Sequence, residues 1–359
     1  MLIPLPNIRT MRAVYQTYNL KFKQPGGTSR GVLKEKETFL IKLKTGGDND
    51  PEFFGECGLF RGLSADDRVD YEDKIAFACR LLESGTEDTY EQFREFPSIQ
   101  FGMEQIKQAQ KHFDQKKHDD FNPILFPSEF TNGEKGISIN GLIWMGSEDF
   151  MRQQIKDKIS QGFRCIKLKI GVDWEMEHQI LQSIRKKFPE QDLELRVDAN
   201  GGFSFEEVQK VLDQLAELKI HSIEQPIRAG QATKMADLCA ATPVPIALDE
   251  ELIGVFYPEE KKKLLQNIRP QFIILKPSLI GGWKGSQEWI DLANENGAGW
   301  WVTSALESNI GLNAIAQWTF TLQNPLAQGL GTGGLFENNF YSRLKVKKDQ
   351  LFFCLNLNL

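Results

Sequence analysis

From residue 136 to residue 330, short runs rich in aliphatic and β-branched residues alternate with segments whose apolar residues recur at helical spacing. This alternation, with a period of about 25 to 30 residues, is typical of βα units that form a parallel sheet. We predict strands at 137–144, 165–170, 193–197, 222–224, 246–248, 272–275, 300–302 and 326–329. Eight strands favour a closed (β/α)8-type barrel, a modified TIM barrel, over an open sheet. No Gly-x-Gly-x-x-Gly sequence opens a helix after the first strand, which argues against a dinucleotide-binding fold.

The segments before and after this alternation have a different texture. Residues 1–125 contain three stretches with strand character, separated by Gly-rich turns, and then two helical patterns. We predict an α+β capping domain there, followed by the barrel at 136–330. Residues 336–359 are too few to form a core of their own, so we expect them to pack back on the N-terminal domain and complete it.

Composition excludes several classes of partner. The 359 residues include 43 basic and 49 acidic ones without a long basic run, so we expect a small-molecule ligand and no nucleic acid. The opening MLIPLPNIRT lacks the features of a leader segment, and no apolar run reaches the roughly 20 residues that span a bilayer, so we expect a cytoplasmic protein without a membrane segment. Five widely spaced cysteines without a CxxC pair favour reduced thiols over disulfides or zinc. The oligomeric state is not indicated.

Charged residues recur at the ends of five consecutive predicted strands. They are Lys169, Asp198, Glu224, Asp249 and Lys276. The intervals between them are 29, 26, 25 and 27 residues, or one βα unit each time. In a barrel, the carboxyl ends of the strands meet at the face where active sites are built, so we expect these side chains to converge.

Three converging carboxylates would repel one another unless a cation neutralised them, and a hard divalent ion with oxygen ligands does so. We therefore predict a Mg²⁺ site, with Mn²⁺ as the alternative. In Lys167-x-Lys169, strand alternation puts both side chains on one face. An amine beside a metal and a second lysine should have a lowered pKa, so we assign Lys169 as a base and Lys167 as its electrostatic neighbour.

Ordinary structural roles compete with this interpretation. A single acid at a strand end is usually a helix cap or a solvated loop residue, and Lys276 on its own fits a surface lysine. Glu250 and Glu307 fit either an acid that orients a lysine or a simple charge at a helix N-terminus. None of the four histidines lies at a strand end. A barrel without catalytic activity that binds a metabolite or a protein therefore stays an alternative, but the complete set of acids and lysines favours an enzyme.

Five motifs together resemble one known family. KLK at 167–169, VDAN, IEQP, ALDE and LKP occur in this order and spacing, and as a set they resemble the enolase superfamily in its muconate-lactonizing-enzyme-like subgroup. The resemblance implies metal ligands at Asp198, Glu224 and Asp249, a base at Lys169 and a second lysine across the substrate at Lys276. It also implies that the N-terminal domain closes over the substrate with loops near 26–28 and 59–61.

Three further segments favour one branch of that subgroup. INGLIWMG at 139–146, SALESNIGLNAIAQW at 304–318 and GTGG at 331–334 resemble the dehydratases of the subgroup, which implies loss of water from a succinyl-bearing cyclohexadiene carboxylate through an enediolate. The subgroup's dipeptide epimerases usually carry Asp-x-Asp after the eighth strand, where this chain reads GLGTGGLF. We expect substrate contacts at Asn200, Ser304 and Gly331. An epimerase or racemase of dipeptides or N-acylamino acids stays open as an alternative.

Overall fold

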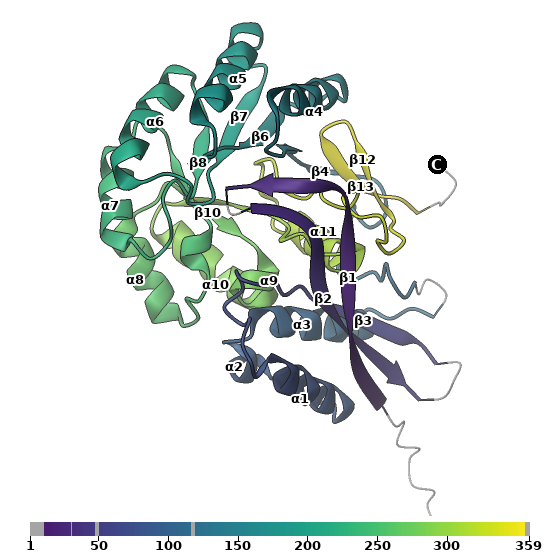
Figure 1. Ribbon diagram of the computed structural model, residues 1–359. Coiled ribbons are helices and arrows are strands. Elements are labelled where there is room, and N and C mark those ends of the chain that lie inside the picture. The colour runs from purple at the N-terminus through teal and green to yellow at the C-terminus, as the bar shows by residue number, and fades with distance from the viewer. Residues whose placement is uncertain (1–10, 30, 47–49, 116–118, 356–359) are drawn as a thin grey trace, which may run out of the picture.

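The computed structural model describes residues 11–29, 31–46, 50–115 and 119–355 (Figure 1). The first ten residues, on which the expectation of no leader segment rests, lie outside this range. The chain first forms a three-stranded antiparallel sheet, as predicted, and then three helices where the sequence predicted two. They are β1 (Met11–Thr28), β2 (Gly31–Thr45), β3 (Glu52–Cys57), α1 (Tyr71–Glu83), α2 (Tyr90–Phe93) and α3 (Pro97–Lys111).

The paired strands β1 and β2 are long enough to reach from the capping domain to the barrel (Figure 1). Their register shifts between Lys21 and Gly26, beyond which pairing resumes up to Thr28. Gly27 forms an antiparallel bridge with Met145, and Ser29 Oγ donates to the Ala199 carbonyl at 2.8 Å. The turn between β1 and β2 is therefore attached to the mouth of the barrel.

Seven strands form one parallel sheet in the order β11 to β5. They are β5 (Gly141–Ile143), β6 (Cys165–Lys169), β7 (Glu194–Asp198), β8 (Ser222–Glu224), β9 (Ile246–Leu248), β10 (Phe272–Leu275) and β11 (Gly299–Val302). The eighth predicted strand closes the barrel through parallel bridges from Gln328 to Ile139 and from Gly329 to Thr303. The predicted fold class, a TIM-type barrel with a capping domain, is confirmed.

Seven helices surround this barrel and alternate with its strands, as the helical spacing of the apolar residues predicts. They are α4 (Glu148–Ser160), α5 (Trp174–Lys187), α6 (Phe205–Glu217), α7 (Ala232–Ala241), α8 (Pro258–Ile268), α10 (Gly282–Glu295) and α11 (Asn309–Thr321). Ser204 caps α6 in a capping box with Glu207. The sequence did not reveal two short helices, a 3-10 turn (Glu250–Leu252) that comes soon after β9 and α9 (Pro277–Ile280) that comes soon after β10.

The single strand predicted at 137–144 is divided in the structure. Its first part, β4 (Ile137–Ser138), pairs with β13 (Gln350–Phe353) outside the barrel, and only the second part is the barrel strand β5. Asn140 lies between the two, where the chain changes sheets. β12 (Leu344–Lys347) completes the small sheet of the C-terminal hairpin.

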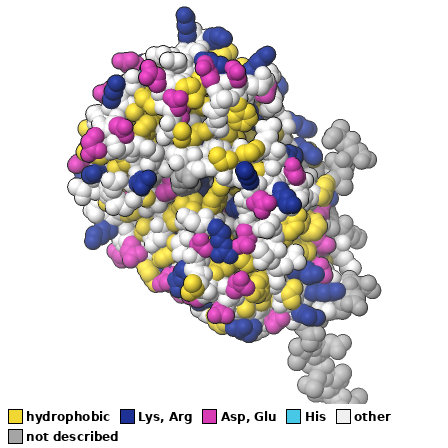
Figure 2. All heavy atoms as spheres, viewed as in Figure 1, with side chains coloured by type: hydrophobic (Ala, Val, Ile, Leu, Met, Phe, Trp, Pro, Cys, Tyr) yellow, Lys and Arg dark blue, Asp and Glu magenta, His cyan; other side chains and the backbone are white. Residues whose placement is uncertain are grey.

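The C-terminal segment returns to the capping domain, as expected. Phe336 forms an antiparallel bridge with Phe22 of β1, and the Lys23 amide donates to the Leu335 carbonyl at 2.9 Å. The face seen in Figure 2 carries basic and acidic side chains interspersed. No helix in the described part of the chain is long and apolar enough to cross a membrane.

Candidate active site

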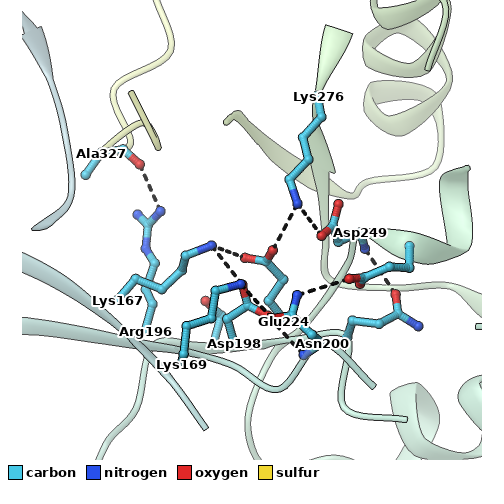
Figure 3. A network of polar contacts seen from close by, with 12 residues as sticks. Lys167, Lys169, Arg196, Asp198, Asn200, Glu224, Asp249, Lys276 and Ala327 are labelled. Atoms are coloured by element: carbon cyan, nitrogen blue, oxygen red, sulfur yellow. Dashed lines mark hydrogen bonds and ion pairs between the residues drawn. The ribbon is translucent and has the colours of Figure 1, made fainter. Parts of the chain in front are cut away.

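The structure brings the six predicted lysines and acids together at the carboxyl ends of the strands (Figure 3). Lys167 and Lys169 lie in β6, Asp198 ends β7 and Glu224 ends β8. Asp249 and Lys276 directly follow β9 and β10. All six side chains are buried. The alternation of β6 points both of its lysines into the barrel mouth, as predicted.

Each lysine is paired with carboxylates. Lys167 Nζ lies 2.6 Å from Glu224 Oε2 and 3.1 Å from Asp198 Oδ2. Lys169 Nζ lies 2.6 Å from Asp198 Oδ2. On the other side of the site, Lys276 pairs with Asp249 and lies 3.8 Å from Glu224 Oε1. Three cations and three anions therefore share one desolvated cluster, where charges interact more strongly than in water.

The pKa values of the two β6 lysines shift in opposite directions. Burial lowers the pKa of Lys169, Asp198 opposes that effect, and the positive charge of Lys167 lowers it further. Burial also acts to lower the pKa of Lys167, but Glu224 and Asp198 outweigh it and raise the pKa above the usual lysine range. Lys169 is thus the amine that loses its proton more readily, which suits the predicted base.

The carboxylates are crowded. Burial raises the pKa of Glu224 to about 7, and the negative charge of Asp198 adds to that rise. Burial, followed by the charge of Glu250, raises the pKa of Asp249. For Asp198, burial also acts upward, but Lys169 and the other nearby lysines keep its pKa well below the usual range. In two of the three acids, Glu224 and Asp249, the nearby lysines therefore do not offset the rise in pKa that burial and neighbouring acids cause.

These residues fit a hard divalent cation. The donors are three carboxylates, which such ions prefer, and Glu224 Oε1 is buried without a hydrogen-bond partner. In the described residues, no three acidic, histidine or cysteine side chains gather closely enough to enclose an ion in this arrangement, and lysine amines contact all three acids instead. The chemistry of the three carboxylates, and the Glu224 oxygen that accepts no hydrogen bond from the described residues, thus support a cation near Asp198, Glu224 and Asp249.

Residues after the strands orient this cluster. Asn200, with φ of 44°, accepts a hydrogen bond from Lys169 Nζ at 2.6 Å through Oδ1. Its amide nitrogen donates to Glu250 Oε1 at 3.0 Å. Glu250 therefore positions Asn200, which in turn positions Lys169. This is one of the two roles that the sequence left open for Glu250.

Gln225 is a supporting residue that sequence reasoning missed. It follows Glu224 with φ of 40°, and its Oε1 accepts the backbone amide of Asp249 at 3.1 Å. Its Nε2 donates to the Ile227 carbonyl at 3.0 Å. The motif IEQP contains this residue, but nothing in a single sequence indicates that its amide joins the ends of β8 and β9.

Ser304 and Glu307 form a separate buried pair. Ser304 Oγ donates to Glu307 Oε2 at 2.6 Å and accepts the Leu306 amide at 3.0 Å. Glu307 also accepts a hydrogen bond from Ser278 Oγ at 2.6 Å. Glu307 therefore connects the loop after β11 to α9, and no lysine in the described ranges donates a hydrogen bond to it. The contact of Ser304 with substrate stays a prediction, as do those of Asn200 and Gly331.

A cleft opens above the lysines and is covered by the capping domain. Its lining residues include Lys167, Lys169, Lys276, Asn200, Ser304 and Gly331. Its apolar walls come from both domains. They include Leu33, Phe60, Leu63, Leu142, Trp144, Leu279 and Leu306. The carboxylates are not among the lining residues. Such a cleft suits an anionic ligand with an apolar ring.

Comparisons with known proteins identify the family of this chain. The family model "Enolase C-terminal domain-like" matches residues 150–348. The chain is 42% identical over 369 residues to the o-succinylbenzoate synthase of Desulfotalea psychrophila, covering 94% of this chain and 97% of that protein. It is 32% identical over 178 residues to the N-succinylamino acid racemase of Thermus thermophilus, covering 50% and 45%.

Two solved structures are similar to this chain over nearly its whole length. The crystal structure of MenC from Desulfotalea psychrophila superposes with a TM-score of 0.80 at 38% identity, covering 96% of this chain and 99% of that one. The L-Ala-D/L-Glu epimerase of Bacillus subtilis superposes with a TM-score of 0.78 at 19% identity, covering 96% of each chain. The second likeness concerns the fold alone.

Proposed function

Because this chain belongs to the enolase superfamily, in its muconate-lactonizing-enzyme subgroup, we propose that it dehydrates 2-succinyl-6-hydroxy-2,4-cyclohexadiene-1-carboxylate to o-succinylbenzoate, a step of menaquinone biosynthesis. The observation that carries this proposal is the buried amine of Lys169, with its lowered pKa, at the base of a cleft that contains two further lysines. The 42% identity to an o-succinylbenzoate synthase along almost the whole chain supports the substrate.

Lys169 acts as base and then as acid. Its neutral amine takes the proton from the ring carbon that bears the carboxylate, and the electron pair of the broken C–H bond moves into the carboxylate as an enediolate. The electrons then return to the ring, the bond from the neighbouring carbon to its hydroxyl breaks, and the Lys169 ammonium protonates the leaving hydroxide to give water. One lysine can serve both steps if the proton and the hydroxyl leave from the same face.

Lys276 supplies a fixed positive charge beside the developing enediolate. It reaches the site from the end of β10, on a different side from the β6 lysines (Figure 3). Because Asp249 and Glu224 raise its pKa against the effect of burial, Lys276 stays protonated. A preorganised cation in a desolvated site stabilises charge that grows during the reaction.

Asp198, Glu224 and Asp249 would hold the divalent cation, Mg²⁺ or alternatively Mn²⁺. When bound, this ion supplies Lewis-acid charge stabilisation to the substrate carboxylate. A dipeptide epimerase from Enterococcus faecalis was solved in complex with Mg, which supports the ion within the same fold. We also propose a cytoplasmic location for this reaction.

A racemase of N-succinylamino acids is the second candidate. Lys169 and Lys276 reach the site from different sides, as an acid–base pair for inverting a carbon centre requires, and the Thermus thermophilus relative has this activity by name. That likeness covers half of the chain. Among the described residues, those that line the cleft include no acid, which disfavours substrates with a free ammonium group but not acylated ones.

An ultraviolet assay of the cyclohexadiene substrate with Mg²⁺ tests the proposal. We expect rapid turnover by the native protein, loss of turnover with a chelator, and a loss of at least about a thousandfold in Lys169→Ala because the base is removed. Lys210→Ala, on the exposed face of α6, is the matched control and should keep full activity. Absence of turnover by folded, metal-loaded protein would refute the synthase, and a screen of N-acylamino acids and dipeptides would then identify the epimerase or racemase.

A further inference from the structure

Three polar side-chain oxygens in the cleft have no hydrogen-bond partner among the described residues. None of them belongs to the lysine–carboxylate cluster, and the exposed fractions of their residues are 8% for Thr303, 6% for Thr332 and 4% for Asn140. In the part of the chain that the structure describes, no group bonds the hydroxyl oxygens of the two threonines or Oδ1 of Asn140. Buried polar atoms without partners cost free energy. Three of them in one cleft are available to a polar ligand.

The three residues come from neighbouring strands at the seam where the barrel closes. Thr303 follows β11 and forms a parallel bridge with Gly329 of the eighth strand. The Asn140 amide donates to the Gln328 carbonyl at 3.0 Å, so Asn140 lies on the other side of that strand. Thr332 follows shortly after it along the chain. All three line the cleft that contains Lys169.

The neighbouring Ser304 differs from them in a decisive way. Its hydroxyl hydrogen is already donated to Glu307, and its oxygen accepts the Leu306 amide. Ser304 therefore has no hydrogen left for a ligand in this arrangement. The hydroxyl hydrogens of Thr303 and Thr332 are uncommitted, and the side-chain amide of Asn140 can present its NH₂ group after rotation about its last bond.

We propose that Thr303, Thr332 and Asn140 form the subsite for the terminal carboxylate of the substrate's succinyl tail. This inference rests on the proposed function. Both the ketone and the carboxylate of that tail are acceptors only, so they need donors, and each of these three side chains can donate. The described residues that line the cleft include three lysines and no acid, so the electrostatic surroundings also favour a second carboxylate there.

A comparison of two ligands tests this assignment. One ligand is the product, o-succinylbenzoate, and the other is 2-butyrylbenzoate, which has the same acyl chain with a methyl group in place of the carboxylate. Dissociation constants are measured by calorimetry on Mg²⁺-loaded native protein and on Thr303→Val, Thr332→Val and Asn140→Leu. Each substitution should weaken o-succinylbenzoate about tenfold, since one hydrogen bond to a charged group is lost, and should change 2-butyrylbenzoate by less than twofold.

Thr319→Val is the matched control. Thr319 is also a buried threonine whose hydroxyl has no partner among the described residues, but it lies on α11 and does not line the cleft. It should change neither ligand.

Equal losses for both ligands, or no loss for either, would overturn the subsite. If native protein turns over the cyclohexadiene substrate in these circumstances, the proposed function survives and only the subsite fails. If native protein neither binds o-succinylbenzoate nor turns over the substrate, both proposals fail together.

Discussion

Two buried glutamates, Glu56 in the capping domain and Glu224 in the barrel, have opposite surroundings. Each oxygen of Glu56 accepts two hydrogen bonds. Oε1 accepts from the Thr38 hydroxyl at 2.8 Å and the Ser308 amide at 2.9 Å. Oε2 accepts from the Ser308 hydroxyl at 2.5 Å and the Gly311 amide at 3.0 Å. Glu224 has one oxygen paired with Lys167 and the other without a hydrogen-bond partner. The protein therefore supplies hydrogen bonds to both oxygens of Glu56, which joins two domains, but to only one oxygen of Glu224 in the site.

The difference separates a structural acid from a functional one. Glu56 connects β3 to the first turn of α11, where amide groups and the helix dipole favour a negative charge. Glu224 is held among other acids, and its pKa is raised to about 7 by burial and by Asp198. A satisfied acid contributes to stability, whereas an unsatisfied one costs stability and is available to an external partner.

Glu224→Gln should give the largest effect. We expect turnover to fall by at least about a thousandfold, since a charged ligand of the cation is lost. The thermal midpoint without metal should change little, because the substitution removes an incompletely paired buried charge. The rise of that midpoint on adding Mg²⁺ should disappear. An unchanged Mg²⁺ response would show that Glu224 does not hold the ion.

Glu56→Ala should reverse this pattern. It leaves the donors on Thr38, Ser308 and Gly311 unpaired between two domains, so we expect a loss of about 3 to 5 kcal/mol in the free energy of unfolding. Activity per folded molecule should fall far less than in Glu224→Gln. Urea unfolding and the ultraviolet assay measure both quantities, with the exposed Glu217→Ala as control. A stable but inactive Glu56→Ala protein would contradict the structural role that we assign to Glu56.

Asp66 is an intermediate case and should give the smallest effect. Its Oδ2 accepts two hydrogen bonds from Ser98, its Oδ1 has no partner among the described residues, and burial raises its pKa to about 6. Because this folded-state pKa lies above the unfolded value of about 4, the folded state binds the proton more tightly, and the contribution to stability is lost as pH rises from about 4 to about 6.

The change over that pH window should be at most about 3 kcal/mol. Other carboxylates with lowered pKa values have the opposite dependence, so the quantity to measure is the difference between native protein and Asp66→Asn in urea unfolding at several pH values. The difference should vary between pH of about 4 and about 6 and be constant above that range. A constant difference throughout would mean that the charge of Asp66 is compensated in the folded state.

Much of this protein could be predicted from its sequence. The period of the βα units, with polar residues at the strand ends, predicted the barrel and brought Lys169, Asp198, Glu224, Asp249 and Lys276 to one face. This works because strand alternation and the parallel arrangement are consequences of local patterns. The identity of the family followed from the motifs at the same strand ends.

The partners of each side chain were decided only by the tertiary structure. A sequence cannot show that Gln225 accepts a hydrogen bond from the Asp249 amide or that Glu307 accepts one from Ser304. Nor can it show that residues 137–144 are divided between two sheets. These contacts depend on where separate strands lie relative to one another. The same holds for the unpaired hydroxyls of Thr303 and Thr332. Local patterns determine which residues face the cleft, and the packing of distant segments determines which of their hydrogen bonds are left for a ligand.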